Sequence, residues 1–190
     1  MKTFEQPERE EAGNESETNL IRKCEFSTNR AYRYTLWREW GTSTLEDLFT
    51  LPKPQDSTAP YAMFVGLNPS TADETNDDPT IRRCVDFANR WGFTALCMTN
   101  LFAFRATDPL VMKAAPDPIG QENDHWLRRV AHEAGVIIAA WGKHGAFMSR
   151  AEKVLSMLPG VYYLRLNDDG SPEHPLYIPA VTTPTPFGKS

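Results

Sequence analysis

The chain has 190 residues, of which 41% are hydrophobic and 24% charged, a composition typical of one soluble globular domain rather than a disordered protein. The formal net charge is −5, from 20 Lys and Arg against 25 Asp and Glu. Residues 1–20 carry −4 of that charge, which leaves about −1 for the rest. A broad basic face for duplex DNA is therefore not indicated.

The three cysteines, Cys24, Cys84 and Cys97, are odd in number and widely spaced. They form neither a paired Cys-x-x-Cys zinc pattern nor a disulfide framework. The N-terminus lacks the basic and then apolar pattern of a signal peptide, and no apolar run approaches the ~18–20 residues of a membrane span. We therefore expect a reduced, cytoplasmic protein without membrane contact.

The chain divides into two predicted tails and one domain. Residues 1–28 are polar and rich in glutamate, which predicts a flexible acidic tail. In the segment Arg30–Trp40, aromatic or apolar residues alternate with charged ones. This pattern predicts a strand with one solvent-exposed face. Residues 52–60 are expected to form a loop. A single α/β domain is predicted over residues 29–179, followed by an extended tail over residues 180–190.

Four short apolar runs are the predicted strands of the domain. They are Tyr61–Leu67, Ala95–Leu101, Gly135–Ala140 and Val161–Leu166. The first three are almost continuously apolar, which is typical of strands buried on both faces of a parallel sheet.

Helix signals separate these runs. Asp78-Pro79 is a start signal for a helix that ends at Gly92, and Asp108-Pro109 repeats it. A third helix begins at Asn123 or Asp124, and a fourth covers Ala146–Leu158. The alternation predicts a three-layer α/β/α domain with a mostly parallel four-stranded central sheet, preceded by an N-terminal strand or hairpin.

Polar side chains follow the carboxyl ends of these strands, where open parallel sheets bind ligands. They are Asn68 and Ser70 after the first strand, Asn100 ending the second, Lys143 and His144 after the third, and His174 after the fourth. An Asn orients a water or reads an amide edge but cannot act as a general base. A His donates to a developing negative oxygen. With Phe104 and Trp141 available for stacking, the set suits a planar heterocycle such as a nucleobase.

Basic and acidic residues near this edge suggest further roles. The candidates for phosphate binding are Arg82, Arg83, Arg105 and Lys143, with surface ion pairs as the alternative for the arginines. The acidic residues between 73 and 78 either form a solvated loop with a helix cap or supply carboxylates to magnesium. His125 and His132 lack a carboxylate or cysteine partner in the sequence pattern, so we predict neither a metal site nor a cofactor.

Five blocks occur in order between Arg33 and about Pro179. They are Leu67–Ala72, Asp78–Cys84, Asn100–Pro109, Ala140–Gly145 and His174–Tyr177. These blocks resemble a bacterial and phage family known as domain-of-unknown-function family 1643. The resemblance implies no activity.

A second resemblance concerns the site itself. Gly66–Ser70 reads Gly-Leu-Asn-Pro-Ser and resembles the first active-site motif of the uracil-DNA glycosylase superfamily, which is Gly-Ile-Asn-Pro-Gly in its mismatch-specific branch. The resemblance implies that the domain has that fold and that Asn68 positions the hydrolytic water. Asn100 resembles the strand-end Asn that reads the base. Ser171–Leu176 is similar to the second motif, in which His174 would stabilise the base oxygen.

The leading hypothesis is an enzyme that hydrolyses an N-glycosidic bond. Its partner would be a nucleotide, a modified base or single-stranded nucleic acid, because a base in a duplex must first be flipped out. The near-zero net charge of the chain beyond residue 20 is also unsuited to tight binding of duplex DNA. Two alternatives stay open: a non-catalytic reader of nucleotides or modified bases, and a magnesium-dependent enzyme of nucleotide phosphate chemistry. The oligomeric state is not predicted.

Overall fold

The computed structural model describes residues 21–40, 61–158 and 160–188. Residues 1–20 of the acidic tail predicted over residues 1–28, and the predicted loop over 52–60, lie outside these residues. No helix in the described part of the chain is long and apolar enough to cross a membrane.

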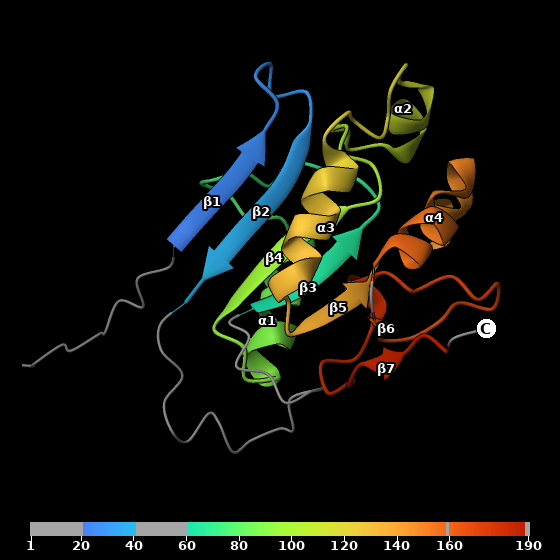
Figure 1. Cartoon of the computed structure of the whole chain (residues 1–190). Coiled ribbons are helices and arrows are strands. Elements are labelled where there is room, and N and C mark those ends of the chain that lie inside the picture. Colours follow the sequence, from blue (N-terminus) through green and yellow to red (C-terminus); the bar gives the residue numbers. More distant parts are fainter. Residues whose placement is uncertain (1–20, 41–60, 159, 189–190) are drawn as a thin grey trace, which may run out of the picture.

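Seven strands form one mixed sheet in the order β1-β2-β4-β3-β5-β6-β7 (Figure 1). Their bounds are Ile21–Phe26 (β1), Arg33–Glu39 (β2), Tyr61–Gly66 (β3), Ala95–Asn100 (β4), Val136–Ala139 (β5), Val161–Tyr163 (β6) and Thr185–Pro186 (β7). The neighbours β4, β3, β5 and β6 pair in parallel, whereas β1, β2 and β7 join the sheet by antiparallel pairing. The fold is therefore α/β, built on a mixed sheet rather than the expected four-stranded, mostly parallel one.

The strands β1 and β7 come from segments that we predicted to be tails, whereas β2 falls within the strand predicted over Arg30–Trp40. Residues 21–26 pair with β2 as a hairpin, and residues 185–186 pair with β6. Both segments carry weak hydrophobic patterns: β1 alternates between exposed and half-buried residues, and both residues of β7 are exposed. Backbone pairing with a neighbouring strand therefore defines them, and their hydrophobicity does not.

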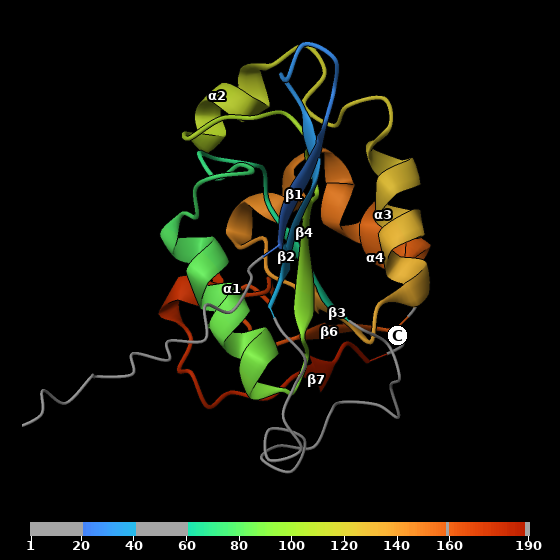
Figure 2. The same ribbon diagram turned by 90° about the vertical axis from the view of Figure 1, so that its left-hand side faces the viewer.

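Helices cover both faces of the sheet. Their bounds are Pro79–Arg90 (α1), Pro109–Ala114 (α2), Asn123–Glu133 (α3) and Arg150–Met157 (α4). Figure 2 shows the sheet edge-on, with α1 on one side and α3 and α4 on the other. Two clusters of buried side chains fill the spaces between these layers.

Two predicted helix starts differ in outcome. Asp78 caps α1 by accepting a hydrogen bond from the Ile81 N–H at 2.9 Å, with Pro79 in the first turn as the sequence indicated. The predicted helix over residues 146–158 begins only at Arg150. Met148 and Ser149 have φ of 56° and 51°, outside the helical region, and so a 3₁₀ segment over Lys143–Ser149 precedes α4.

The prediction that β2 has one solvent-exposed face is wrong. Arg33, Thr35 and Arg38 are all at most 2% exposed. The segment Ala72–Asp77, which precedes α1, covers β2 and supplies hydrogen-bond acceptors to the guanidinium groups of Arg33 and Arg38.

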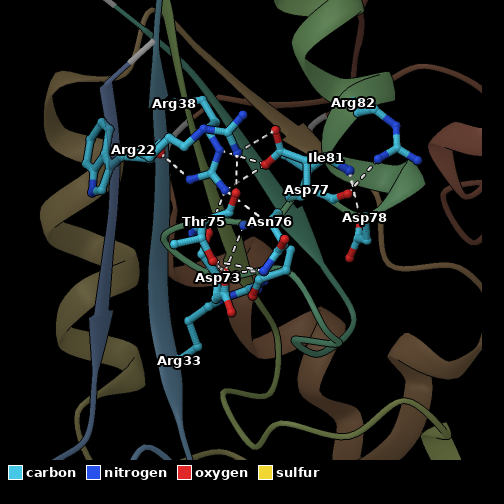
Figure 3. Close-up of polar contacts among 12 residues, drawn as sticks. Arg22, Arg33, Arg38, Asp73, Thr75, Asn76, Asp77, Asp78, Ile81 and Arg82 are labelled. Atoms are coloured by element: carbon cyan, nitrogen blue, oxygen red, sulfur yellow. Dashed lines mark hydrogen bonds and ion pairs between the residues drawn. The ribbon is translucent and has the colours of Figure 1, made fainter.

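Arg38 fastens this segment to the sheet (Figure 3). Its Nε donates to the Asp77 carboxylate at 2.7 Å, and its Nη2 donates to the Asp73 carbonyl at 2.6 Å. Arg22, on β1, reaches the other oxygen of Asp77 at 3.1 Å. Because Asp77 directly precedes the cap of α1, this network fixes where α1 begins.

We expect Arg38→Met to lower the free energy of unfolding by about 3 kcal/mol, since it leaves the half-buried Asp77 carboxylate and a loop carbonyl without their donor. Urea denaturation measures this. The matched control is Arg90→Met, which removes an exposed ion pair to Asp86 and should cost about 0.5 kcal/mol or less. Equal losses in the two variants would contradict the anchoring role of Arg38.

Candidate functional site

A cavity of about 540 Å³ opens at the carboxyl ends of the parallel strands. The chain leaves β3 toward α1 on one face and leaves β5 toward α4 on the other, which is the arrangement that creates a crevice in α/β sheets. Six of the sequence-predicted site residues line the cavity. They are Asn68, Ser70, Asn100, Trp141, Lys143 and His174, and His144, which was predicted at the same edge of the sheet, lines it as well.

Asn100 forms part of the cavity wall at the end of β4. It is 3% exposed, and its buried side-chain nitrogen has no hydrogen-bond partner in the described structure. An unpaired buried amide costs free energy, so a ligand that accepts a hydrogen bond from Asn100 would gain affinity. This is the observation that most directly marks the cavity as a binding site.

Gly66 makes room for the Asn100 amide. A Cβ at Gly66 would lie 2.8 Å from Asn100 Oδ1, closer than real Cβ contacts come. Behind Asn100, the Asn123 side chain donates to the carbonyls of Asn100 and Leu101 at 3.1 and 2.9 Å. Arg150 Nε also donates to the Leu101 carbonyl, at 2.8 Å. The end of β4 is therefore held in place from the rear.

Asn68 has a fixed orientation. Its amide nitrogen donates to the Ala106 carbonyl at 2.7 Å and to the Pro69 carbonyl at 3.1 Å. Only the NH₂ end of the amide can donate to carbonyls, so these bonds identify Oδ1 as the remaining acceptor. No hydrogen bond to that oxygen occurs within the described residues. Asn68 thus presents an acceptor, which is the group needed to orient a water.

His174 is half-buried beside the start of α1. Burial lowers its pKa below the ordinary 6.5, and the Asp78 carboxylate opposes that shift. Its Nδ1 accepts from the Leu176 N–H at 3.4 Å, so the neutral imidazole carries its proton on Nε2. A neutral imidazole in this tautomer can donate a hydrogen bond from Nε2.

Asp78 is a cavity residue that sequence reasoning had treated only as a cap or as part of the acidic loop. Its Oδ1 accepts from Ile81 N–H, which leaves the second carboxylate oxygen as an acceptor. Because helix capping fully explains the Asp-Pro pair, the sequence pattern did not indicate that Asp78 also lines a cavity. Arg33 and Glu173 were also missed; both line the cavity, and Glu173 forms an ion pair with Arg165.

Trp141 and Lys143 form another part of the wall, after β5. Trp141 is 3% exposed and packs over Gly145, where any Cβ would overlap the indole ring. Lys143 is exposed at the first position of the 3₁₀ segment. Lys143 lies seven residues before α4 and so not at the N-terminus of an α-helix, and its role in phosphate binding stays a prediction.

Two predicted site residues pack against the β1–β2 hairpin instead of lining the cavity. The Phe104 ring lies edge-on to Tyr32, with the ring centroids 5.7 Å apart. The Arg105 guanidinium lies over the Phe26 ring at 5.0 Å from its centroid. These contacts join the segment after β4 to the hairpin.

Arg82 and Arg83 also lie outside the cavity lining. Arg82 Nη1 donates to the Asp77 carbonyl at 2.6 Å. Arg83 donates to the Ile178 carbonyl and pairs with Asp86 at 3.4 Å. Both guanidinium groups hold neighbouring backbone segments against α1.

The other acidic residues before α1 have partners of their own. Asp73 accepts from the backbone N–H groups of Thr75 and Asn76, which lowers its pKa to about 2. Glu74 pairs with Arg30 at 2.9 Å. Since Asp77 is held by two arginines, these carboxylates are engaged in fixing the loop. Within the described ranges no three His, Cys, Asp or Glu side chains gather as metal ligands would.

The comparisons with known proteins give one match. Residues 33–176 match the model of a family described as "Protein of unknown function (DUF1643)". Neither the curated proteins nor the solved structures contain a match to the chain. The matched range includes Asn68, Asp78, Asn100 and His174, so the cavity is formed mostly by the family's own domain.

Gly66→Ala should displace the Asn100 amide, lower the free energy of unfolding by roughly 1–3 kcal/mol and weaken ligand binding in the cavity. Gly188→Ala is the matched control, because a Cβ there meets no atom within 4 Å. Denaturation and ligand titration of the two variants check this. Unchanged binding in Gly66→Ala would show that the Asn100 position is unimportant.

The lowered pKa of His174 predicts a pH-dependent stability. Below about pH 6.5 the unfolded chain takes up a proton at this residue more readily than the folded chain. The contribution of His174 to stability is therefore complete above pH 6.5 and falls as the pH drops toward the folded pKa. Unfolding curves at several pH values should show a flatter profile for His174→Gln, and identical profiles would contradict the shift.

Proposed function

The chain belongs to the DUF1643 family, and we propose that it hydrolyses the N-glycosidic bond of a nucleotide, a modified nucleoside or an unpaired strand of nucleic acid. The supporting observation is that one cavity gathers an amide without a partner on Asn100, an oriented acceptor on Asn68, a neutral imidazole on His174 and a carboxylate oxygen on Asp78. The resemblance of Gly66–Ser70 to a glycosylase motif points in the same direction.

Each group has a role in this reaction. Asn100 hydrogen-bonds the edge of the base and holds it in the cavity. The bond from C1′ to the base nitrogen breaks with its electron pair moving to the base, and His174 Nε2–H donates to the base oxygen on which negative charge develops. Water bound to Asn68 Oδ1 adds to C1′. Asp78 accepts the proton of that water, so the products are a sugar hydroxyl and a base that takes up a proton.

A binding-only function is the second candidate. It is favoured by the hydrogen bonds of Asn68, whose amide nitrogen ties the loop after β3 to Ala106 and so has a structural use of its own. In this case Asn100 and Trp141 would hold a base and no bond would break. The magnesium-dependent alternative has less support, because Asp73, Glu74 and Asp77 are engaged by arginines and backbone groups and Asp78 alone keeps a carboxylate oxygen toward the cavity.

The test is chromatographic detection of base released from nucleosides, nucleotides and single-stranded oligonucleotides. We expect release by the wild-type chain and a rate about 10²–10³-fold lower in His174→Gln, the typical effect of removing one donor to a developing oxyanion. Asp78→Asn should lower the rate about 10²–10⁴-fold, and its fold should persist because Asn also caps helices well.

Asp108→Asn is the matched control for Asp78→Asn. Asp108 caps α2 through the Leu110 N–H but does not line the cavity. It should keep the full rate. Base release that survives both Asp78→Asn and His174→Gln would refute the assigned roles. Binding of a base without release from any substrate would favour the second candidate.

A further inference from the structure

Arg33 lines the cavity where β2 begins, and its positive charge has no direct counterion. It is 2% exposed, and no ion pair of the described residues involves it. Its Nη1 donates to the Ala72 carbonyl, whereas its buried Nε has no partner. Burying an unpaired charge is costly, so the group needs an explanation beyond packing.

A β-bulge directs Arg33 into the cavity. On β1, Glu25 pairs with Thr35 but Phe26 pairs with Arg33, so Tyr34 is an extra residue in β2. Strict alternation would put residues 33 and 38 on opposite faces of the sheet. With the bulge they share a face, and their guanidinium groups reach the adjacent carbonyls of Ala72 and Asp73 (Figure 3). Bulges beside functional sites commonly re-aim a side chain in this way.

Charged groups of both signs act on Arg33, but no carboxylate of the described residues forms an ion pair with it. Arg38 and Arg105 act on it with the same sign, and together with burial, the largest cause, they lower its pKa to about 10. Asp78 opposes them from a distance greater than that of an ion pair, as does Cys24. Arg38 already has Asp77 as a counterion. Because Arg33 is buried, has an unpaired Nε and forms no ion pair among the described residues, an additional negative group next to it would be stabilised.

We infer that Arg33 binds an anionic oxygen group of the substrate, a phosphate or a carboxylate, at the β2 end of the cavity. The strand order β2-β4-β3-β5 puts this end next to Asn100 and away from Lys143, which follows β5. Resting on the proposed function, the inference makes the substrate a nucleotide or an acidic base in preference to a neutral nucleoside. A guanidinium suits either anion, because both accept paired hydrogen bonds.

Isothermal titration of the full chain tests this. The ligands are the common nucleosides, their 5′-monophosphates, 5-carboxyuridine and inorganic phosphate. We expect at least one anionic ligand to bind roughly 10- to 100-fold more tightly than its neutral parent nucleoside, the effect of a charge-assisted hydrogen bond. Preference for a monophosphate places the anion on the sugar, and preference for 5-carboxyuridine places it on the base.

Arg33→Met should abolish that preference by lowering the affinity for the anionic ligand to about that for its neutral parent nucleoside. Arg90→Met, an exposed arginine of α1 outside the cavity, should retain it. If Arg33→Met does not fold, Arg33→Lys replaces it. The lysine ammonium keeps the positive charge but lacks the paired N–H donors of the guanidinium, so the preference for the anionic ligand should shrink without vanishing.

Equal affinity for neutral and anionic ligands, a preference that persists in Arg33→Met, or no binding of any anionic ligand would overturn the inference. The proposed hydrolysis fails separately. A preference for anionic ligands that depends on Arg33, without base release, would support the anion site and refute the proposed hydrolysis. Base release that is independent of Arg33 and of ligand charge would support the hydrolysis and refute the anion site.

Discussion

The hydrogen bonds of the buried Arg38 are the interaction on which the site depends. They hold the segment Asp73–Asp77 across β2, and α1 begins at the next residue. Asp78 is thereby placed at the cavity, close enough to His174 to influence its charge. Asn100 and Gly66 face this wall from the ends of β4 and β3. A charge network between β1, β2 and one loop thus sets the geometry of a cavity formed mainly by other elements.

The cavity also contains polar groups that the folded protein leaves without partners. The Asn100 amide nitrogen and the Arg33 Nε are both buried and unpaired among the described residues, while Asn123 and Arg150 satisfy the carbonyls immediately behind. Natural proteins accept such costs mainly where function requires them. Behind the strand, Asn123 Oδ1 and Arg150 Nη1 also lack partners, but Asn100 and Arg33 line the cavity, where a ligand can reach them.

Much of this arrangement follows from local sequence signals. The apolar runs predicted β3, β4, β5 and β6, the Asp-Pro pairs predicted the starts of α1 and α2, and the strand ends predicted Asn68, Asn100 and His174 as cavity residues. The remaining features of the fold depend on contacts between segments far apart in the sequence. The strand β1, the bulge at Tyr34 and the burial of Arg33 depend on which segments meet, and no periodicity within one segment encodes that. The same limit explains why Phe104 and Arg105, adjacent to the site in sequence, pack on the hairpin instead.

The central claim is that the unpaired Asn100 amide receives the edge of a base. The most direct measurement is the ¹⁵N-resolved NMR spectrum of the side-chain amides, with the Asn100 signal assigned by its loss in Asn100→Asp. On addition of nucleosides and nucleotides, the account predicts that the Asn100 Nδ2–H₂ resonances shift with saturation while those of Asn123, held behind the strand, move little. Saturable binding that leaves the Asn100 resonances in place, or no binding by any member of the panel, would contradict it.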